Sequence, residues 1–153
     1  MNPMDIAQAY LDEAAAAVLA DDWVTYRAGI SLPCATVSRD GTTIIRTEAA
    51  LRAGYDGIRA MLIGHRVTDY IKMAEAVQFL DKDLISGSYI SHIIISGHLV
   101  MPPFRSLLDL RFDGRRWRVA AVTNGLSQTH WPLMQMEPRV SLGMLPHPEG
   151  AGP

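Results

Sequence analysis

The hydrophobic pattern of this chain changes between Gly64 and Val67, from mainly helical to extended throughout, and that change limits the folds it can adopt. Before this point, apolar residues recur at helical spacing in three segments, as in the stripe that begins with Ile6, Tyr10 and Ala14, with two short extended runs before the third segment. After it, apolar and polar residues alternate over short runs, and turn sequences separate the runs. Helices followed by hairpin-connected strands are typical of the α+β class.

Each expected helix has a start signal. Asn2 can cap a first helix with Pro3 at its first position, and Asp5 faces the positive end of the helix dipole. The other two helices are expected to run from the Asp21-Asp22 pair to about Gly29, and from a Thr47 cap to Gly64.

The expected strands are joined by short turns, so neighbours along the chain should pair antiparallel. Two of the runs are unusually long, which indicates a strongly bent sheet with bulges, and Gly87 and Gly97 are candidate bends. We therefore predict three helices in the N-terminal half, packed on a strongly bent antiparallel sheet that encloses a pocket. The expected strands are Leu32–Ser38, Thr42–Thr47, Val67–Leu80, Leu84–Met101, Ser106–Phe112 and Arg116–Thr123.

The 153 residues suffice for one domain, which we place at residues 1–125. The remaining stretch, 126–153, holds five of the nine prolines and three of the eight methionines, so regular structure there should be short. Its apolar side chains, Trp131 among them, need burial. We expect this extension to pack on the domain or on a partner.

Charge and composition exclude several partners. The net charge of −2 offers no basic excess for a phosphate backbone, so nucleic acid is not an expected partner. The single cysteine, Cys34, cannot form an internal disulfide, which fits a reducing compartment. Asp5, Asp12 and Glu13 stand where a signal peptide would be basic and then apolar. No membrane partner is expected, and the expected location is the cytoplasm.

The third expected strand contains candidate acid–base residues. If Val67–Leu80 is unbroken, its odd-numbered residues share one mostly apolar face, which includes Asp69 and Glu75. A carboxylate on an apolar wall tends to have a raised pKa and can act as a general base or acid. In the alternative interpretation, Asp69 lies at the exposed end of the strand and a bulge turns Glu75 outward.

Two histidines lie on the fourth expected strand. His92 and His98 are six residues apart, about 20 Å along an extended strand, so they cannot share a metal ion. No other His or Cys spacing typical of a metal site occurs, and we expect neither a metal nor a cofactor. His92 could serve as a pocket general base, or it could be a hydrogen-bonded histidine of the core or an interface.

The order of these elements resembles the nuclear transport factor 2-like superfamily with its cone-shaped, cystatin-like α+β fold. The last strand adds Asp113-Gly114 followed by Arg116-Trp117-Arg118-Val119, and Gly97 through Met101-Pro102-Pro103 is similar to a turn of polyketide cyclases. The resemblance covers roughly residues 4–125, and SnoaL-like proteins are the most similar branch. It implies a small-molecule pocket between the helices and the concave face of the sheet.

The resemblance also implies a homodimer through the outer face of the sheet. The last strand supports this, because Ala120 and Val122 lie opposite the face that carries Trp117 and Val119, so both of its faces are apolar. Function varies across such folds from isomerase, dehydratase and cyclase to binding alone, so the fold does not decide it.

The aromatic residues Trp23, Tyr26, Tyr55 and Tyr89 are candidates for lining the pocket, with core packing as the alternative. The resemblance places Tyr26 near the pocket mouth, where its hydroxyl could polarise a carbonyl group. Where the cyclases have a catalytic aspartate just past the last strand, this chain has Asn124, which cannot take up a proton as a carboxylate does. Asn124 is therefore a candidate for hydrogen bonding to a ligand in the pocket, with a plain turn residue before Gly125 as the alternative.

Two functions follow as alternatives. In the first, the chain is a cofactor-independent lyase or isomerase for a small apolar or carbonyl-containing substrate, with Asp69 or His92 as the acid/base and Tyr26 as a hydrogen-bond donor. In the second, the chain is a non-catalytic ligand-binding or dimeric accessory protein, which the amide at Asn124 favours.

Overall fold

Three helices form where the sequence predicts them. In a computed structural model that describes residues 2–124, they are α1 (Pro3–Ala20), α2 (Trp23–Ala28) and α3 (Glu48–Gly64). The side chains of Asn2 and Thr47 accept hydrogen bonds from the backbone N–H groups of Asp5 and Ala50, so both predicted caps are confirmed. The three-helix part of the predicted α+β fold is therefore confirmed.

The strands form one strongly curved sheet in the order β2-β1-β7-β6-β4-β3, with β5 paired to β4. Pairing is antiparallel except between β1 and β7, which run parallel, so the sheet is mixed rather than purely antiparallel as predicted. The parallel pair forms because the last strand returns to lie beside the first. The strands are β1 (Ile30–Ser38), β2 (Gly41–Ile45), β3 (Asp69–Asp81), β4 (Leu84–Ile95), β5 (His98–Leu99), β6 (Phe104–Phe112) and β7 (Trp117–Asn124).

The long fourth strand of the prediction divides in two. β4 ends at Ile95, and Ser96 and Gly97 take positive φ angles of 48° and 85°, which reverse the chain. β5 then pairs back onto β4, with Leu99 opposite Ile94. The predicted bend at Gly97 is therefore a hairpin turn, because its backbone conformation ends a strand rather than curving one.

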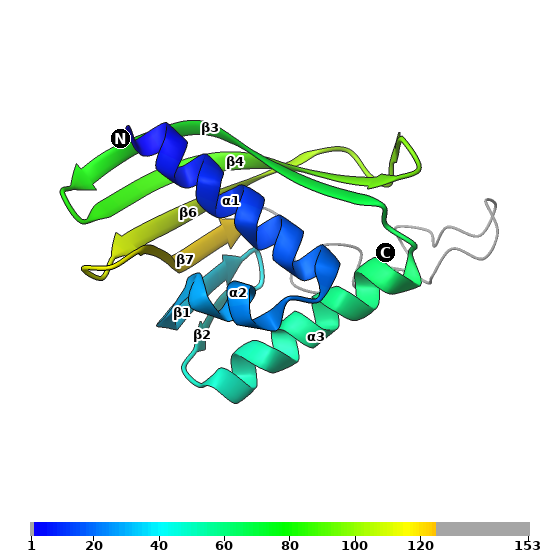
Figure 1. The fold of residues 1–153 in the computed structure, drawn as a ribbon, viewed down its shortest axis with the longest axis horizontal. Helices are drawn as coiled ribbons and strands as arrows, with labels where there is room; N and C mark the ends of the chain where they lie inside the picture. The colour runs from blue at the N-terminus through cyan, green and yellow to red at the C-terminus, as the bar shows by residue number, and fades with distance from the viewer. Residues whose placement is uncertain (1, 125–153) are drawn as a thin grey trace.

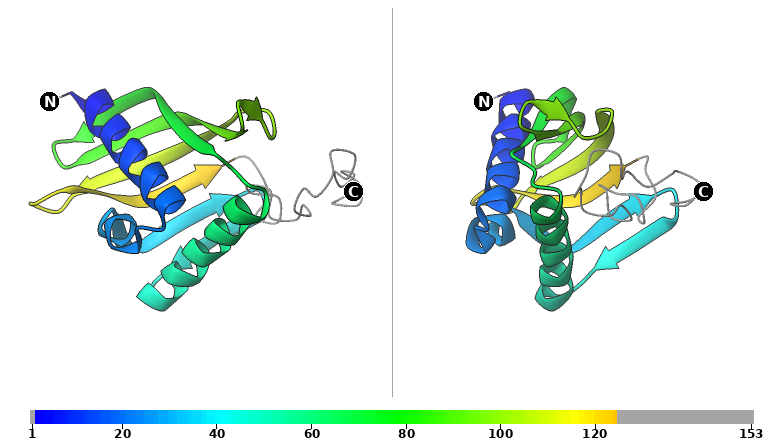
Figure 2. Two further views of the ribbon diagram at one scale, coloured as in Figure 1. Left: turned by 45° about the vertical axis from the view of Figure 1, so that its right-hand side comes forward. Right: turned by 90° about the vertical axis from the view of Figure 1, so that its right-hand side faces the viewer.

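All three helices lie on one side of the sheet (Figures 1 and 2). Helix α1 runs across β3 and β4, and α3 lies near the C-terminal end of α1. Buried side chains between these layers form two clusters. One centres on Leu11, Ile85 and Leu110, and the other on Val18, Leu62 and Ile93. The core therefore lies between the helices and the inner face of the sheet.

The opposite face of the sheet is partly apolar. Ile71, Met73 and Leu107 are 43%, 53% and 50% exposed there, beside an ion pair between Glu75 and Arg105. The homodimer expected through this face stays a prediction. The expected extension at 126–153 lies outside the described residues. No helix within residues 2–124 is long and apolar enough to cross a membrane.

Candidate functional site

A cavity of about 300 Å³ opens between the helices and the inner face of the sheet. Its wall is mostly aliphatic and aromatic, with few polar groups. All five tyrosines of the sequence contribute to it, although they come from three helices and two strands and are not clustered in sequence. The residues that carry its chemistry are Tyr10, Tyr26, Cys34, Thr36, Tyr55, Tyr70, Lys72, Tyr89 and Asn124.

Among residues 2–124, Lys72 is the one basic side chain in this wall. It points inward because β3 alternates: Ile71 and Met73 face outward and are exposed, so Tyr70 and Lys72 face the helices. The Lys72 Nζ atom lies 5.0 Å from the Tyr70 ring centroid and 5.6 Å from that of Tyr89. These aromatic faces stabilise an ammonium group by cation–π attraction.

No carboxylate within the described residues forms an ion pair with Lys72. Burial removes water from the ammonium group and lowers the pKa of Lys72 to about 8. A buried charge is normally paired, so an amine without an acidic partner is unusual. Such an amine can hold or release a proton near neutral pH, and a ligand can reach it from the cavity.

Gln8 of α1 binds the backbone of β3 at Lys72 and Ala74. Its Nε2 donates to the carbonyl of Lys72 at 2.8 Å, and its Oε1 accepts from the N–H of Ala74 at 2.8 Å. Because β3 is the last strand in the sheet, these backbone groups have no further strand to pair with. The Gln8 side chain supplies that missing partner and thereby sets the position of Lys72 relative to α1.

We expect Gln8→Met to lower the free energy of unfolding by about 1–2 kcal/mol, because it removes two hydrogen bonds from a partly buried strand edge. Chemical denaturation followed by circular dichroism measures this. Gln78→Met is the matched control, since Gln78 lies on β3 and its side chain is exposed. Equal stabilities of the two variants would contradict this role for Gln8.

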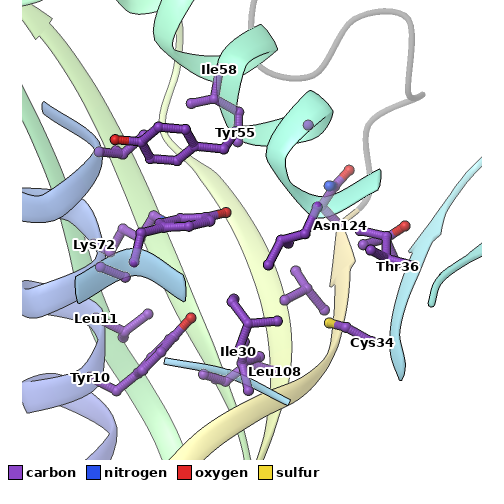
Figure 3. Close-up of a pocket in the computed structure, with 18 of the residues that line it drawn as sticks. Tyr10, Leu11, Ile30, Cys34, Thr36, Tyr55, Ile58, Lys72, Leu108 and Asn124 are labelled. Atoms are coloured by element: carbon purple, nitrogen blue, oxygen red, sulfur yellow. The ribbon is translucent and has the colours of Figure 1, made fainter. Parts of the chain in front are cut away.

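Burial keeps the cavity tyrosines protonated. It raises the pKa values of Tyr10, Tyr26 and Tyr70 well above the ordinary value, and that of Tyr89 to about 12. The hydroxyl of Tyr10 points toward the cavity (Figure 3). The buried hydroxyl of Tyr70 has no hydrogen-bond partner among residues 2–124. These groups are available as hydrogen-bond donors to a ligand.

Tyr55 differs from the other tyrosines because its hydroxyl is already engaged. It donates to the Asp21 carboxylate at 2.8 Å, while its ring packs 4.9 Å from the Tyr26 ring and 5.0 Å from the Trp23 ring, centroid to centroid. The Arg52 guanidinium lies 4.9 Å over the Trp23 ring. Tyr55 therefore gives the cavity a fixed aromatic wall rather than a free donor.

The far side of the cavity is formed by the sheet. The Cys34 thiol of β1 points toward the cavity, and Asn124 and Thr36 lie together across from Tyr10 in Figure 3. Burial raises the pKa of Cys34 to about 11, so the thiol stays protonated and a poor nucleophile. Cys34 is therefore best described as a small buried apolar residue of the cavity wall.

Four of the predicted site residues line the cavity together: Tyr26, Tyr55, Tyr89 and Asn124. Trp23 lies behind the wall, stacked on Tyr26 with ring centroids 6.3 Å apart. This brings one predicted donor, Tyr26, into the same space as an amine that the sequence analysis did not single out.

The pocket placement considered for Asp69 and His92 holds for neither residue, and Asp69 lies at the exposed end of its strand, as in the alternative interpretation. Asp69 is exposed at the start of β3, and His92 pairs with Ile71 on the outer face of the sheet, so neither lines the cavity. Glu75 also lies outside, where hydrogen bonds from Arg105 and then Ser88 lower its pKa to about 2. Because both faces of β3 carry apolar residues, the apolar pattern alone could not identify the face that lines the cavity.

The residues missed by the sequence analysis are Lys72, Tyr10 and Tyr70. Two signals could have found them. Lys72 is one of only two lysines in the chain, and it stands inside a strand rather than at its end. Tyr10 had been assigned to the buried stripe of the first helix, which is correct but leaves out its hydroxyl. No group of three or more metal-binding side chains gathers within residues 2–124.

Solved structures with the same fold include several proteins of unassigned function. A cystatin-like domain from Nostoc punctiforme aligns with a TM-score of 0.60 at 14% identity, over 82% of this chain and 77% of that one. An NTF2-like protein from Shewanella oneidensis aligns with a TM-score of 0.61 at 11% identity, over 79% and 97%. A provisionally assigned ketosteroid isomerase from Shewanella frigidimarina aligns with a TM-score of 0.58 at 16% identity, over 78% and 94%.

No protein-family pattern and no curated protein sequence matches this chain. At identities this low, the structural similarities show the fold alone. The chain therefore has the cystatin-like, NTF2-like α+β fold that the order of its elements predicts, with a mixed sheet. The more specific SnoaL-like branch stays a prediction.

Proposed function

We propose that this chain binds a small, largely apolar carbonyl compound in the tyrosine-lined cavity and transfers a proton next to the carbonyl group, as lyases and isomerases do. The observation that carries the proposal is Lys72, an amine without an acidic partner in the described residues, facing an apolar cavity. It takes the acid/base role for which the sequence analysis had considered Asp69 and His92.

The protonation states suit this chemistry. A general base works best when its pKa is near the working pH, and a lysine reaches that range when burial lowers its pKa, as burial does for Lys72. A carbonyl oxygen that gains negative charge during proton removal needs hydrogen-bond donors. Tyr26, Tyr10 and Tyr70 remain protonated and can donate to that oxygen.

The shape and lining of the cavity support an apolar ligand. A volume of about 300 Å³ is at the lower end for small-molecule sites. Aliphatic side chains such as Leu11, Ile58 and Leu108 form much of its wall, so a ligand gains mainly from apolar contact. The Shewanella frigidimarina protein is provisionally named for a substrate that is itself an apolar ketone, which agrees with this ligand class.

The test measures deuterium exchange next to a carbonyl group. α-Tetralone, a bicyclic aromatic ketone, is incubated in D₂O at pH 8 with the wild type, Lys72→Met or Lys82→Met, and exchange is followed by NMR. We expect the wild type and Lys82→Met to accelerate exchange equally, because Lys82 is exposed in a turn. Lys72→Met should lose about 100-fold of that acceleration, the lower end for general acid–base catalysis.

Ligand binding is measured in parallel by protein fluorescence, since Trp23 packs directly behind the cavity wall. Binding without exchange would favour the alternative of a non-catalytic ligand-binding protein. Neither binding nor exchange, across a panel of aromatic and alicyclic ketones, would contradict the proposal.

A further inference from the structure

The amine of Lys72 can do more than carry a proton. We propose that its Nζ atom bonds covalently to the carbonyl carbon of an aldehyde or ketone in the cavity and forms an imine. This inference rests on the proposed function in one respect, that the same cavity admits a carbonyl compound. It adds the ligand class, reactive carbonyls, and a covalent intermediate on a named atom.

The first requirement is a neutral amine, because only the unprotonated form has a lone pair to attack with. With its pKa lowered to about 8, roughly a tenth of Lys72 is neutral at pH 7, whereas fewer than about one exposed lysine in a thousand is. The lowering comes from burial, and no acidic side chain within the described residues opposes it by pairing with Lys72.

The second requirement is a place for the carbonyl group beside the amine. Lys72 faces the cavity from β3, while Tyr10 and Leu11 face it from α1 and Cys34 from β1, so the amine lies at a wall rather than in a packed core. Its backbone is anchored to α1, since Gln8 bonds the Lys72 carbonyl and the nearby Ala74 N–H. A fixed nucleophile loses little entropy when it attacks.

The third requirement is a proton donor for the carbonyl oxygen. The Tyr10 hydroxyl points into the cavity, and the buried Tyr70 hydroxyl has no partner among residues 2–124. Both stay protonated because burial raises their pKa values. A hydroxyl group that lacks a partner inside a protein is costly, and a ligand oxygen would satisfy it.

The imine forms in two stages. The Nζ lone pair forms the C–N bond, the C=O π electrons move to oxygen, and that oxygen takes up a proton from a tyrosine hydroxyl while the nitrogen gives one up, which gives a neutral carbinolamine. The nitrogen lone pair then forms the C=N bond as the hydroxyl takes up a second proton and leaves as water, and loss of the remaining N–H proton gives the imine, so one amine and one carbonyl give one imine and one water. Protonation of the imine nitrogen draws electrons from the neighbouring C–H or C–C bond, which is how a lysine promotes isomerase or lyase chemistry.

The lysine content of the chain makes a sharp test possible, because Lys72 and Lys82 are its only lysines. The full chain is incubated with 2-naphthaldehyde and cyanoborohydride at pH 8, which reduces any imine to a stable secondary amine. Peptide mapping by mass spectrometry then locates the adduct. We expect at least tenfold more adduct on Lys72 than on Lys82, whose exposed ammonium is hydrogen-bonded to Asp83.

Two variants and a competitor serve as controls. Lys82→Arg should keep the Lys72 adduct, and Lys72→Arg should lose it, while labelling of the α-amino group stays the same in every sample and serves as the reference. Circular dichroism checks that Lys72→Arg is folded. Excess α-tetralone should slow the labelling of Lys72 at least fivefold and leave that of the α-amino group unchanged, because only the former lies in the cavity.

The outcomes separate this inference from the proposed function. Equal labelling of Lys72 and Lys82, in a protein whose fluorescence shows that it binds the aldehyde, would overturn the imine and leave the proposed binding function standing. No binding and no adduct would overturn both. Selective labelling of Lys72 that is lost in Lys72→Arg and retained in Lys82→Arg would establish the inference.

Discussion

The Lys72→Met protein is expected to be more stable than the wild type at pH 7, by about 2–3 kcal/mol in the free energy of unfolding. Holding a lysine at a pKa of about 8 instead of its ordinary value of 10.5 costs the fold roughly 3 kcal/mol while the amine is charged. Attraction to the Tyr70 and Tyr89 rings offsets part of that cost. Methionine fills a similar volume without the charge.

The stability that Lys72→Met gains over the wild type should decrease as the pH rises. Between pH 8 and 10.5 the unfolded chain binds more protons at Lys72 than the folded chain does, so the wild type gains stability from this residue as pH rises. The advantage of Lys72→Met is therefore full below pH 8 and shrinks toward pH 10.5. Other groups also contribute to the pH dependence. Burial raises the pKa values of the remaining acidic groups in the cavity, so the folded protein loses stability as the pH becomes alkaline. Those groups are Tyr10 from α1, Tyr26 from α2, Cys34 from β1, Tyr55 from α3, Tyr70 from β3 and Tyr89 from β4.

The difference between the two proteins isolates Lys72, since the tyrosines and Cys34 are common to both. Urea denaturation at pH 7, 8, 9 and 10 measures it, with Lys82→Met as the control for a lysine on the surface. A Lys72→Met protein that is less stable than the wild type at pH 7 would show that the ammonium has a stabilising partner, and the account of the site would be wrong.

Replacing Gly87 by alanine is expected to lower the free energy of unfolding by about 3 kcal/mol, the upper end for an overpacked site. A Cβ atom there would lie 2.7 Å from Val77 Cγ2 and 2.8 Å from the carbonyl oxygen of Ala76. The second contact is with backbone that is itself part of the sheet, so it cannot move aside easily. β3 and β4 approach this closely where their register shifts, between Ala74 and Ala76.

Gly54→Ala is the matched control. Gly54 lies within α3, and a Cβ atom built on it meets nothing within 4 Å. Alanine should stabilise that helix by up to about 1 kcal/mol. Thermal unfolding of both variants therefore should show opposite shifts in Tm. A Gly87→Ala protein as stable as the wild type would contradict the close contact between the two strands.

The local part of the fold was predictable, because caps and turns act over a few residues. Asn2 and Thr47 start helices because their side chains accept hydrogen bonds from backbone N–H groups of the first helical turn. The parallel pairing of β1 with β7 was not predictable in the same way. It joins segments some ninety residues apart in sequence, and nothing in either strand pattern specifies it.

The candidate site shows where pattern reasoning fails. Both faces of β3 carry apolar side chains, so alternation could not tell which face packs on the helices. The prediction placed Asp69 on the same mostly apolar face as Ile71 and Met73. That face lies on the outside of the sheet, where Ile71 and Met73 are exposed. Lys72, which the pattern did not single out, lies on the face that packs under α1. The contact that decides this, between Gln8 and the edge of β3, is tertiary and has no local signal.

The most direct test of the account is the ionisation of the Lys72 amine. With only two lysines in the chain, a protein labelled with ¹³C and ¹⁵N lysine gives two side-chain signals, and Lys72→Arg assigns them. The account predicts that the Lys72 signal titrates with a pKa of about 8 while that of Lys82 titrates above the ordinary lysine value. Two signals that both titrate above pH 10 would contradict it.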